Sequence, residues 1–286
     1  SDRIIKKLYK GVSSTLKNIN GSFLPQGITH DYWNAYIYGN EIKFVYFKKG
    51  IIKQKPSTKT ASGKKNTADN QSRFDSSIKR AKSRVFELAS CNEFTHFCTF
   101  TLDKNKYDRY DLTKFRKDLA QYIRNINRNR ENKIKYLSIP ERHKDGAWHI
   151  HSLISGLTDK ELTAFKVSDN IPARLKKQIK NGEVVYNWSA IAKRFGWFTA
   201  TAIRNKQATA KYVTKYITKS LQKVALNNGC HLYFASQGLN SKTVAAYHSF
   251  EAPPFLDGEW DFENDFVKIK TVSLFSDTDT PLEVSR

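Results

Sequence analysis

Between residues 94 and 239, short runs rich in β-branched and aromatic residues alternate with longer runs that have the apolar spacing of a helix. Runs of the first kind favour strands, and apolar residues that recur every three to four positions favour amphipathic helices. Strands are expected at 94–103, 133–142, 148–157, 196–203 and 231–239. Helices are expected at 111–130, at about 206–224 and in parts of the polar segment 158–194. This order predicts an α+β fold, in which helices cover one face of an antiparallel sheet of about five strands.

Further elements are expected before this order. Residues 34–50 alternate in hydrophobicity around Gly39-Asn40, which predicts a β-hairpin. Residues 73–90 carry apolar side chains at helical spacing and basic side chains between them, which predicts an amphipathic helix. The intervening segment 53–72 is rich in Lys, Ser, Thr and Asn, and it is expected to be a flexible basic linker or loop.

The composition also changes after Pro253-Pro254, where the chain becomes acidic. This tail is expected to be an appendage or a loosely docked strand. The sequence therefore predicts three parts, which are an N-terminal hairpin with a basic linker (1–72), a main domain (73–250) and an acidic C-terminal tail (251–286).

Charge is distributed unevenly along the chain. The 286 residues contain 49 Lys and Arg against 27 Asp and Glu, a net charge of +22 at pH 7. Residues from Glu251 onward carry nine acidic and three basic side chains, so the first 250 residues hold a net charge of +28. A folded body of this charge favours a polyanionic partner, with counterion release driving affinity. A basic surface that serves only solubility is the weaker alternative at a pI near 9.8.

Several classes of protein are disfavoured. Cys91, Cys98 and Cys230 follow no CxxC or zinc-finger spacing, and their odd number argues against a disulfide framework. No apolar run approaches the length of a transmembrane helix and no signal peptide is visible, so a cytoplasmic protein is expected. The sequence contains no GxxxxGK pattern, which argues against a P-loop ATPase.

Two histidines stand at the spacing that places them side by side on a strand. In "DGAWHIHSLISG" (145–156), His149 and His151 flank Ile150, directly after the turn dipeptide Asp145-Gly146. Side chains alternate along a strand, so the two imidazoles share one face and Ile150 points to the other. Such a pair can bind a metal ion, although two polar residues on a wet sheet face are the commoner case.

The helix expected at about 206–224 carries two tyrosines, Tyr212 and Tyr216, four residues apart and therefore on one helix face. Lys211, Lys215 and Lys219 form a second row beside them. Such tyrosines often pack in a core, but tyrosine is also one of the side chains that form covalent catalytic intermediates. Its ordinary pKa of about 10 means that a phenolate needs nearby cations, which lysines or a metal ion would supply.

Three motifs together resemble those of the HUH endonucleases. "WHIHSLI" resembles their His-hydrophobe-His motif, "KYVTKYITK" their tyrosine motif in its two-tyrosine form, and "FCTFTLD" the hydrophobic-Thr strand of their first motif. The order of the motifs is that of rolling-circle replication initiators, and "IPERHKDGAWHIH" and "LYFASQGL" are similar to replication proteins (Rep) of bacterial phages and plasmids. The resemblance covers about residues 90 to 245. It implies that 73–250 is an HUH nuclease domain with a ferredoxin-like (RRM-like) core.

The function that this resemblance implies is a metal-dependent, site-specific single-stranded DNA endonuclease and strand transferase. A tyrosine would attack a phosphate of single-stranded or hairpin origin DNA, leaving a 5′-phosphotyrosyl link and a free 3′-OH for a polymerase. The second tyrosine would permit a second transesterification. A host helicase and polymerase are the implied partners, and the bacterial host cytoplasm is the implied location.

The resemblance also implies roles for individual residues. The catalytic residues would be Tyr212, Tyr216, Lys215 and Lys219. A divalent ion, Mn²⁺ or Mg²⁺, would be held by His149, His151 and Glu141, and the DNA would contact Lys211, Arg142 and Lys144. Tyr212 is expected to act first because it lies nearer the helix N-terminus, although the dipole contributes at most a few tenths of a kcal/mol there.

Glu141 is the conditional member of this set. It comes opposite His149 on the same face only if the loop between the two strands has an odd number of residues. Its alternative role is a surface salt bridge.

Other classes of function explain part of the pattern. A non-catalytic module that binds RNA or DNA on an aromatic sheet would account for the charge, but not for two histidines together with two tyrosines. Relaxases and single-strand transposases share the HUH chemistry. The histidine-triad hydrolases need a third alternating histidine, and position 153 is Leu.

Overall fold

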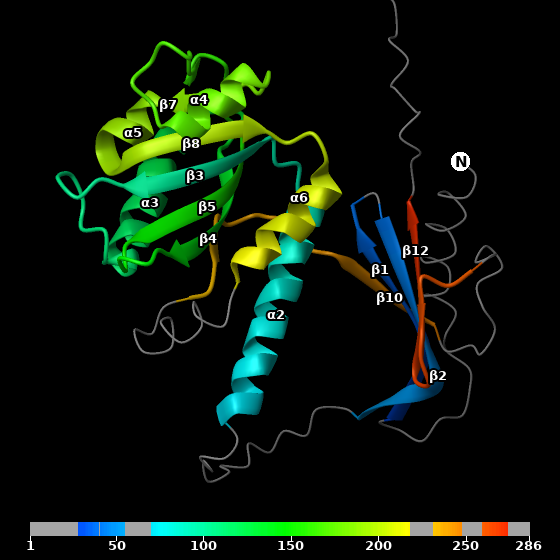
Figure 1. Ribbon diagram of the computed structural model, residues 1–286. Helices are drawn as coiled ribbons and strands as arrows, with labels where there is room; N and C mark the ends of the chain where they lie inside the picture. The colour runs from blue at the N-terminus through cyan, green and yellow to red at the C-terminus, as the bar shows by residue number, and fades with distance from the viewer. Residues whose placement is uncertain (1–27, 40, 55–69, 218–230, 248–258, 274–286) are drawn as a thin grey trace, which may run out of the picture. The chain divides into compact units, whose positions relative to one another are not determined.

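The computed structural model describes residues 28–39, 41–54, 70–217, 231–247 and 259–273 (Figure 1). The chain divides into two compact units, of which unit 1 comprises residues 1–65 with 242–286 and unit 2 comprises residues 66–241. Lys219, Cys230, most of the expected linker and most of the acidic tail lie outside the described residues.

Unit 1 contains a five-stranded antiparallel sheet with the order β10-β1-β2-β12-β11. Its strands are β1 (Ile28–Tyr38), β2 (Glu41–Gln54), β10 (Thr243–Tyr247), β11 (Phe262–Glu263) and β12 (Val267–Ser273). The hairpin expected at 34–50 is confirmed as β1 and β2. Part of the acidic tail forms β12, which pairs with β2 from Val267 opposite Phe47 to Ser273 opposite Glu41. Trp33 is buried at the centre of this unit, where its ring lies 4.6 Å from that of Tyr46.

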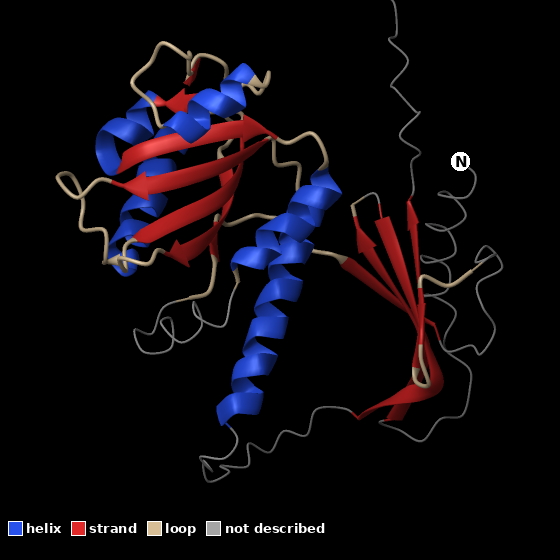
Figure 2. Cartoon of the chain, viewed as in Figure 1, coloured by secondary structure: helices blue, strands red, loops and turns tan. Residues whose placement is uncertain are grey.

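Unit 2 contains a seven-stranded antiparallel sheet with the order β6-β7-β8-β3-β5-β4-β9 (Figure 2). The α+β class is confirmed, but this sheet has more strands than the five expected. Its strands are β3 (His96–Leu102), β4 (Lys135–Arg142), β5 (Trp148–Ser155), β6 (Leu162–Ala164), β7 (Tyr186–Trp188), β8 (Gly196–Ala202) and β9 (Phe234–Ala235). The two additional strands, β6 and β7, come from the polar segment 158–194. The strand expected at 231–239 shrinks to the two residues of β9.

The helical elements of unit 2 are α2 (Asn70–Ser90), α3 (Leu112–Asn127), α4 (Ala173–Lys180), α5 (Ser189–Phe195), α6 (Lys206–Val213) and the 3-10 turn η2 (Thr214–Tyr216). α3 begins at Asp111, whose side chain accepts a 2.8 Å hydrogen bond from the Lys114 backbone N–H. Its buried residues have the expected helical spacing and are Leu112, Phe115, Leu119 and Ile123. No helix in the described ranges is long and apolar enough to cross a membrane.

The helix expected to run from about 206 to 224 changes character earlier than predicted. The α-helix ends at Val213 and continues as the 3-10 turn η2, and residues 218–224 lie outside the described part. The Thr214 hydroxyl donates a 2.7 Å hydrogen bond to the Lys211 carbonyl oxygen. A threonine that bonds to the preceding turn competes for a carbonyl that the next helical turn would use, which accounts for the change.

Helices lie on both faces of the unit 2 sheet, so the prediction of one covered face was wrong. Phe115 of α3 packs on one face, with its ring 5.9 Å from that of Phe100. On the opposite face, Phe97 of β3 meets Tyr212 of α6 at a ring separation of 5.7 Å. The sequence pattern could not show this second layer, because α6 is short and buries only Ala210 and Val213.

A glycine after β5 allows two backbone segments to approach closely. Gly156 has φ +81°, and a Cβ there would lie 2.4 Å from the Lys133 carbonyl oxygen. Gly182 has a similar φ of +85° but nothing within 4 Å of the same position. Gly156→Ala is therefore expected to lower the free energy of unfolding by about 1–3 kcal/mol more than Gly182→Ala, because overpacking adds to the backbone strain that both share.

Chemical denaturation of the two variants beside wild type measures this difference. Equal losses would show that Lys133 moves away without cost, and the close approach would then not determine the need for glycine.

Candidate active site

The two histidines of β5 lie on one sheet face, and threonines of β3 lie opposite them. The β3–β5 register pairs Thr101 with His149 and Thr99 with His151. Each threonine hydroxyl lies 3.3 Å from the Nδ1 atom of its histidine. These hydrogen bonds fix the orientation of each ring and leave Nε2 as the second nitrogen, as partners of ligand histidines commonly do.

Glu141 lies on the same face, on the neighbouring strand β4. Residues 143–147 form a turn with an odd number of residues, and the register places Glu141 opposite His149. The carboxylate nevertheless reaches the other histidine, with Oε2 2.8 Å from Nε2 of His151. The three side chains named from the sequence are therefore neighbours, and the carboxylate and His151 form a hydrogen-bonded pair.

The environment of both imidazoles disfavours their charged form. Burial lowers the pKa of His149 below its usual value, and the nearby His143 and His151 lower it further, against Glu141, which raises it. Burial also lowers the pKa of His151, partly offset by the hydrogen bond to Glu141. The His143 ring stacks on that of His149 with the ring centres 4.6 Å apart. A neutral imidazole can offer a lone pair to a metal ion.

Within the described ranges, no group of three or more His, Cys, Asp and Glu side chains is arranged as a ready cage for a metal ion. The donor set at the histidines consists of two imidazoles and one carboxylate, and two of its donor atoms are 2.8 Å apart. Two ligands bound at about 2.1 Å and at right angles to one octahedral ion lie about 3 Å apart. The residues present therefore fit a divalent ion in chemistry and in this spacing.

The tyrosine pair meets the histidine pair at this place on the sheet. The Tyr216 ring stacks on that of His151 with the ring centres 3.7 Å apart. Its hydroxyl donates a 2.8 Å hydrogen bond to the Tyr212 hydroxyl. Tyr212 is 45% exposed, whereas Tyr216 is half-buried. The more accessible hydroxyl is thus also the acceptor of the pair.

Burial raises the pKa of Tyr216 above its usual value, and its hydrogen bond to Tyr212 raises it further. Arg174 of α4 acts in the opposite direction and favours the phenolate. This arginine belongs to the polar insert 158–194, and sequence reasoning did not identify it.

The basic residues named from the sequence have different positions. The Lys215 ammonium lies 5.5 Å from the centre of the Tyr212 ring, and Lys211 is exposed on the same helix. Arg142 donates a 3.3 Å hydrogen bond to the Gly146 carbonyl oxygen within the β4–β5 turn, where Lys144 is exposed. Only Lys215 is seen in contact with a tyrosine.

A hollow of about 650 Å³ adjoins Tyr212. Its walls are partly aromatic and partly polar, and they include Phe97, Tyr186, Gln178, Glu183, Arg204 and Tyr212. A volume between 300 and 1,000 Å³ with a few polar groups is typical of ligand sites.

The threonines and Phe97 could have been found from the strand period. Phe97, Thr99 and Thr101 alternate along β3, so they share one face. Their contacts with the histidines depend on the pairing of β3 with β5, which has no local sequence signal.

The fold and the site define a basic α+β domain in which a histidine pair and a tyrosine pair meet on one sheet face. Residues 95–221 match the model of a family of replication-associated proteins of the ORF2 type. The matched region spans less than half of the 286-residue chain and includes both histidines and both tyrosines. No curated protein and no solved structure matches the chain significantly. The chain is therefore similar to replication-associated proteins over the region that carries the candidate site.

Proposed function

We propose that this protein is a replication initiator that nicks single-stranded or hairpin origin DNA through a tyrosine and starts rolling-circle replication. The observation that carries the proposal is the contact between the two pairs, in which the Tyr216 ring lies on His151 and its hydroxyl bonds to Tyr212. The match of this region to replication-associated proteins supports it, as does the net charge of +22. A host helicase and polymerase would then unwind and extend the nicked strand.

The reaction is a transesterification. The tyrosine oxygen attacks the phosphorus of a backbone phosphodiester, and the bond from phosphorus to the 3′ oxygen breaks. The hydroxyl proton of the tyrosine is lost, and the leaving 3′ oxygen takes up a proton to become a free 3′-OH. The new 5′-phosphotyrosyl ester keeps the energy of the broken bond, so no nucleotide is consumed and a second tyrosine can reverse or redirect the transfer.

Tyr212 is the first nucleophile in this proposal. Its hydroxyl is the exposed member of the pair and already accepts a hydrogen bond from Tyr216. A donated hydrogen bond favours a phenolate oxygen, and Lys215 beside the ring favours its negative charge. Tyr216 serves the second transfer, after its partner has been consumed. Lys219, four residues beyond Lys215, is proposed for the same cationic role.

His149, His151 and Glu141 would hold the divalent ion, Mn²⁺ or Mg²⁺, through imidazole nitrogens and a carboxylate oxygen. When bound, such an ion supplies positive charge that stabilises the phosphate in the transition state. Thr99 and Thr101 keep the imidazoles in place from behind.

The hollow beside Tyr212 is the place where nucleotides next to the cleaved phosphate would lie. Phe97 and Tyr186 offer aromatic walls, and Gln178 and Glu183 offer groups that hydrogen-bond to base edges. Lys211, Arg142 and Lys144 would contact backbone phosphates on either side.

The proposal predicts an SDS-stable adduct when the protein is incubated with replicon-derived single-stranded oligonucleotides and Mn²⁺. Denaturing electrophoresis detects the covalent complex as a band that survives boiling, and the Tyr212→Phe/Tyr216→Phe double variant is the control that should form none. Binding without any adduct across a broad oligonucleotide panel would favour a non-catalytic nucleic-acid-binding module instead.

A further inference from the structure

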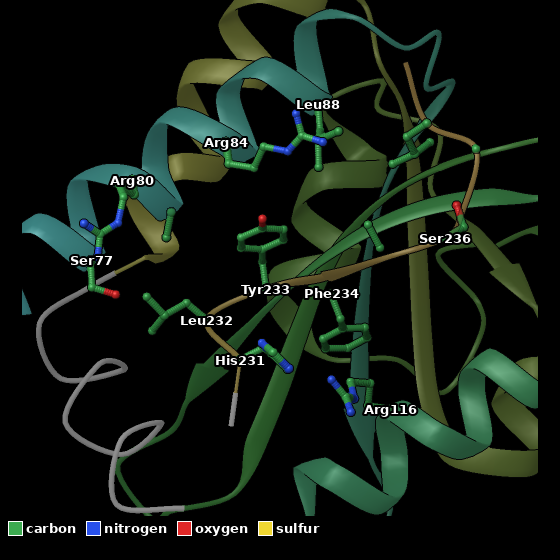
Figure 3. A pocket seen from close by; sticks show the side chains of 14 residues that line it. Ser77, Arg80, Arg84, Leu88, Arg116, His231, Leu232, Tyr233, Phe234 and Ser236 are labelled. Atoms are coloured by element: carbon green, nitrogen blue, oxygen red, sulfur yellow. The ribbon is translucent and has the colours of Figure 1, made fainter. Parts of the chain in front are cut away.

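A second hollow of unit 2, of about 770 Å³, is lined by residues of α2, α3 and the segment 231–239 (Figure 3). It is called the arginine groove below. One face of α2 contributes Ser77, Arg80, Arg84 and Leu88, which follow one another at helical spacing. Arg116 of α3 and Tyr233 of the segment before β9 line it as well.

The arginine groove is cationic. Arg80, Arg84, Arg116 and His231 line it, and its lining includes no Asp or Glu. Arg84 is held in place by Glu87 and by a 3.0 Å hydrogen bond to the Ser241 hydroxyl. Arg80 and Arg116 form no ion pair with any carboxylate of the described residues, so their guanidinium groups are available to an anion.

An aromatic ring stands among these cations. Figure 3 shows the half-buried Tyr233 in the middle of the groove, with Arg80 and Arg84 on the α2 side and Arg116 on the other. A guanidinium group donates several hydrogen bonds in the planar geometry that suits phosphate oxygens, and an aromatic ring offers a face to an unpaired base.

We propose that the arginine groove binds single-stranded DNA, with Arg80 and Arg116 on backbone phosphates and one unpaired base stacked on Tyr233. The inference rests on the proposed function in one respect only, namely that this strand belongs to the DNA that is nicked. Stacking on Tyr233 requires an unpaired base, which distinguishes a single strand from a duplex.

The groove lies near enough to the candidate active site for one strand to reach both. β9 pairs with β4 at Phe234 opposite Ser138, three residues before Glu141. At about 3.4 Å per residue, this separation along β4 is about 10 Å. α2, which carries Arg80 and Arg84, also packs against α6, which carries Tyr212.

The test measures binding of a fluorescent single-stranded oligonucleotide by anisotropy, without divalent ions, over a series of salt concentrations. Arg80→Gln/Arg116→Gln is expected to weaken binding and to reduce the log–log salt slope by about 1.4, since each phosphate contact on a single strand contributes about 0.7. The matched control, Lys82→Gln/Lys117→Gln, removes two charges from exposed positions of the same helices outside the groove. Equal effects of the two double variants would overturn the proposal.

Tyr233 provides the second arm. Tyr233→Leu is expected to lower single-strand affinity at least about five-fold, the lower range for one base–aromatic stack, whereas Tyr233→Phe retains it. Thermal melting of both variants checks that the fold is kept. An oligonucleotide carrying 5-iododeoxyuridine should photo-crosslink to the peptide that contains Tyr233, and this readout does not depend on stability. A variant that binds single strands normally and a crosslink elsewhere would reject the stack.

The duplex of the same sequence separates the two forms of DNA. Equal loss of duplex affinity in Tyr233→Leu would contradict single-strand binding. The adduct assay on the same variants is independent of these results. Normal groove binding without any adduct would reject the nicking function alone, and an adduct with unaffected groove variants would reject the groove alone.

Discussion

Tyr212→Phe is expected to lose the first cleavage of origin DNA, with a rate lower by about 10⁴-fold or more, the scale observed when a covalent nucleophile is deleted. The Tyr212 hydroxyl is exposed, accepts a hydrogen bond from Tyr216 and lies beside Lys215. Removing it leaves no oxygen in this position. Mass spectrometry of the trapped adduct should place the 5′-phosphate on Tyr212 in the wild-type protein.

Tyr216→Phe should retain the first cleavage at a rate reduced by about 10-fold, because one hydrogen bond to a developing phenolate is lost. Its second strand transfer should fail. Tyr122→Phe, which removes a hydroxyl from α3 on the opposite face of the sheet, is the control and should behave as wild type. An adduct found only on Tyr216 would reverse the proposed order, adducts on both would show interchangeable roles, and an adduct in the double variant would remove both tyrosines from the chemistry.

Loss of either histidine is expected to abolish cleavage while binding of single-stranded DNA stays nearly intact. His149→Ala and His151→Ala each delete a nitrogen whose ring is oriented by a threonine hydroxyl. Without that nitrogen the divalent ion is not held beside the attacked phosphate. Adduct formation across a Mn²⁺ titration measures the effect, and DNA binding without metal shows that the fold remains.

The control for the histidine variants is His96→Ala on β3, which removes an imidazole whose contacts are to Thr95 and Tyr186. It should leave cleavage unchanged. Full cleavage by the His149→Ala/His151→Ala double variant would end the metal-site proposal. Glu141→Ala should shift the Mn²⁺ titration more mildly, and an unshifted titration would make Glu141 only the salt-bridge partner of His151.

The sequence predicted the central part of unit 2 because its elements have strong local signals. Asp145-Gly146 between two apolar runs marks the β4–β5 turn, and the two-residue period places both histidines on one face. β6 and β7 were not predicted, since strands of three residues are too short to show a period. The end of α6 at Val213 depends on a hydrogen bond of Thr214, which no hydrophobic pattern encodes.

The candidate site was predictable in its residues more than in its contacts. The odd loop correctly placed Glu141 opposite His149, yet its carboxylate extends to His151, because the side-chain conformation selects between neighbours that both lie within its reach. Arg174 approaches Tyr216 from an insert whose own fold had no clear signal. Long-range pairing is what local patterns lack.

The sheet of unit 1 joins strands that flank all of unit 2 in the sequence, with β1 paired to β10 and β2 to β12. During synthesis, the β1–β2 hairpin therefore leaves the ribosome well before its other partner strands exist. A two-stranded hairpin is marginal alone in water. Unit 2 is complete before β10 and β12 emerge, and at ordinary translation rates this interval is on the order of ten seconds. The nascent chain thus acquires the half that carries the candidate site first, and the sheet of unit 1 is completed last.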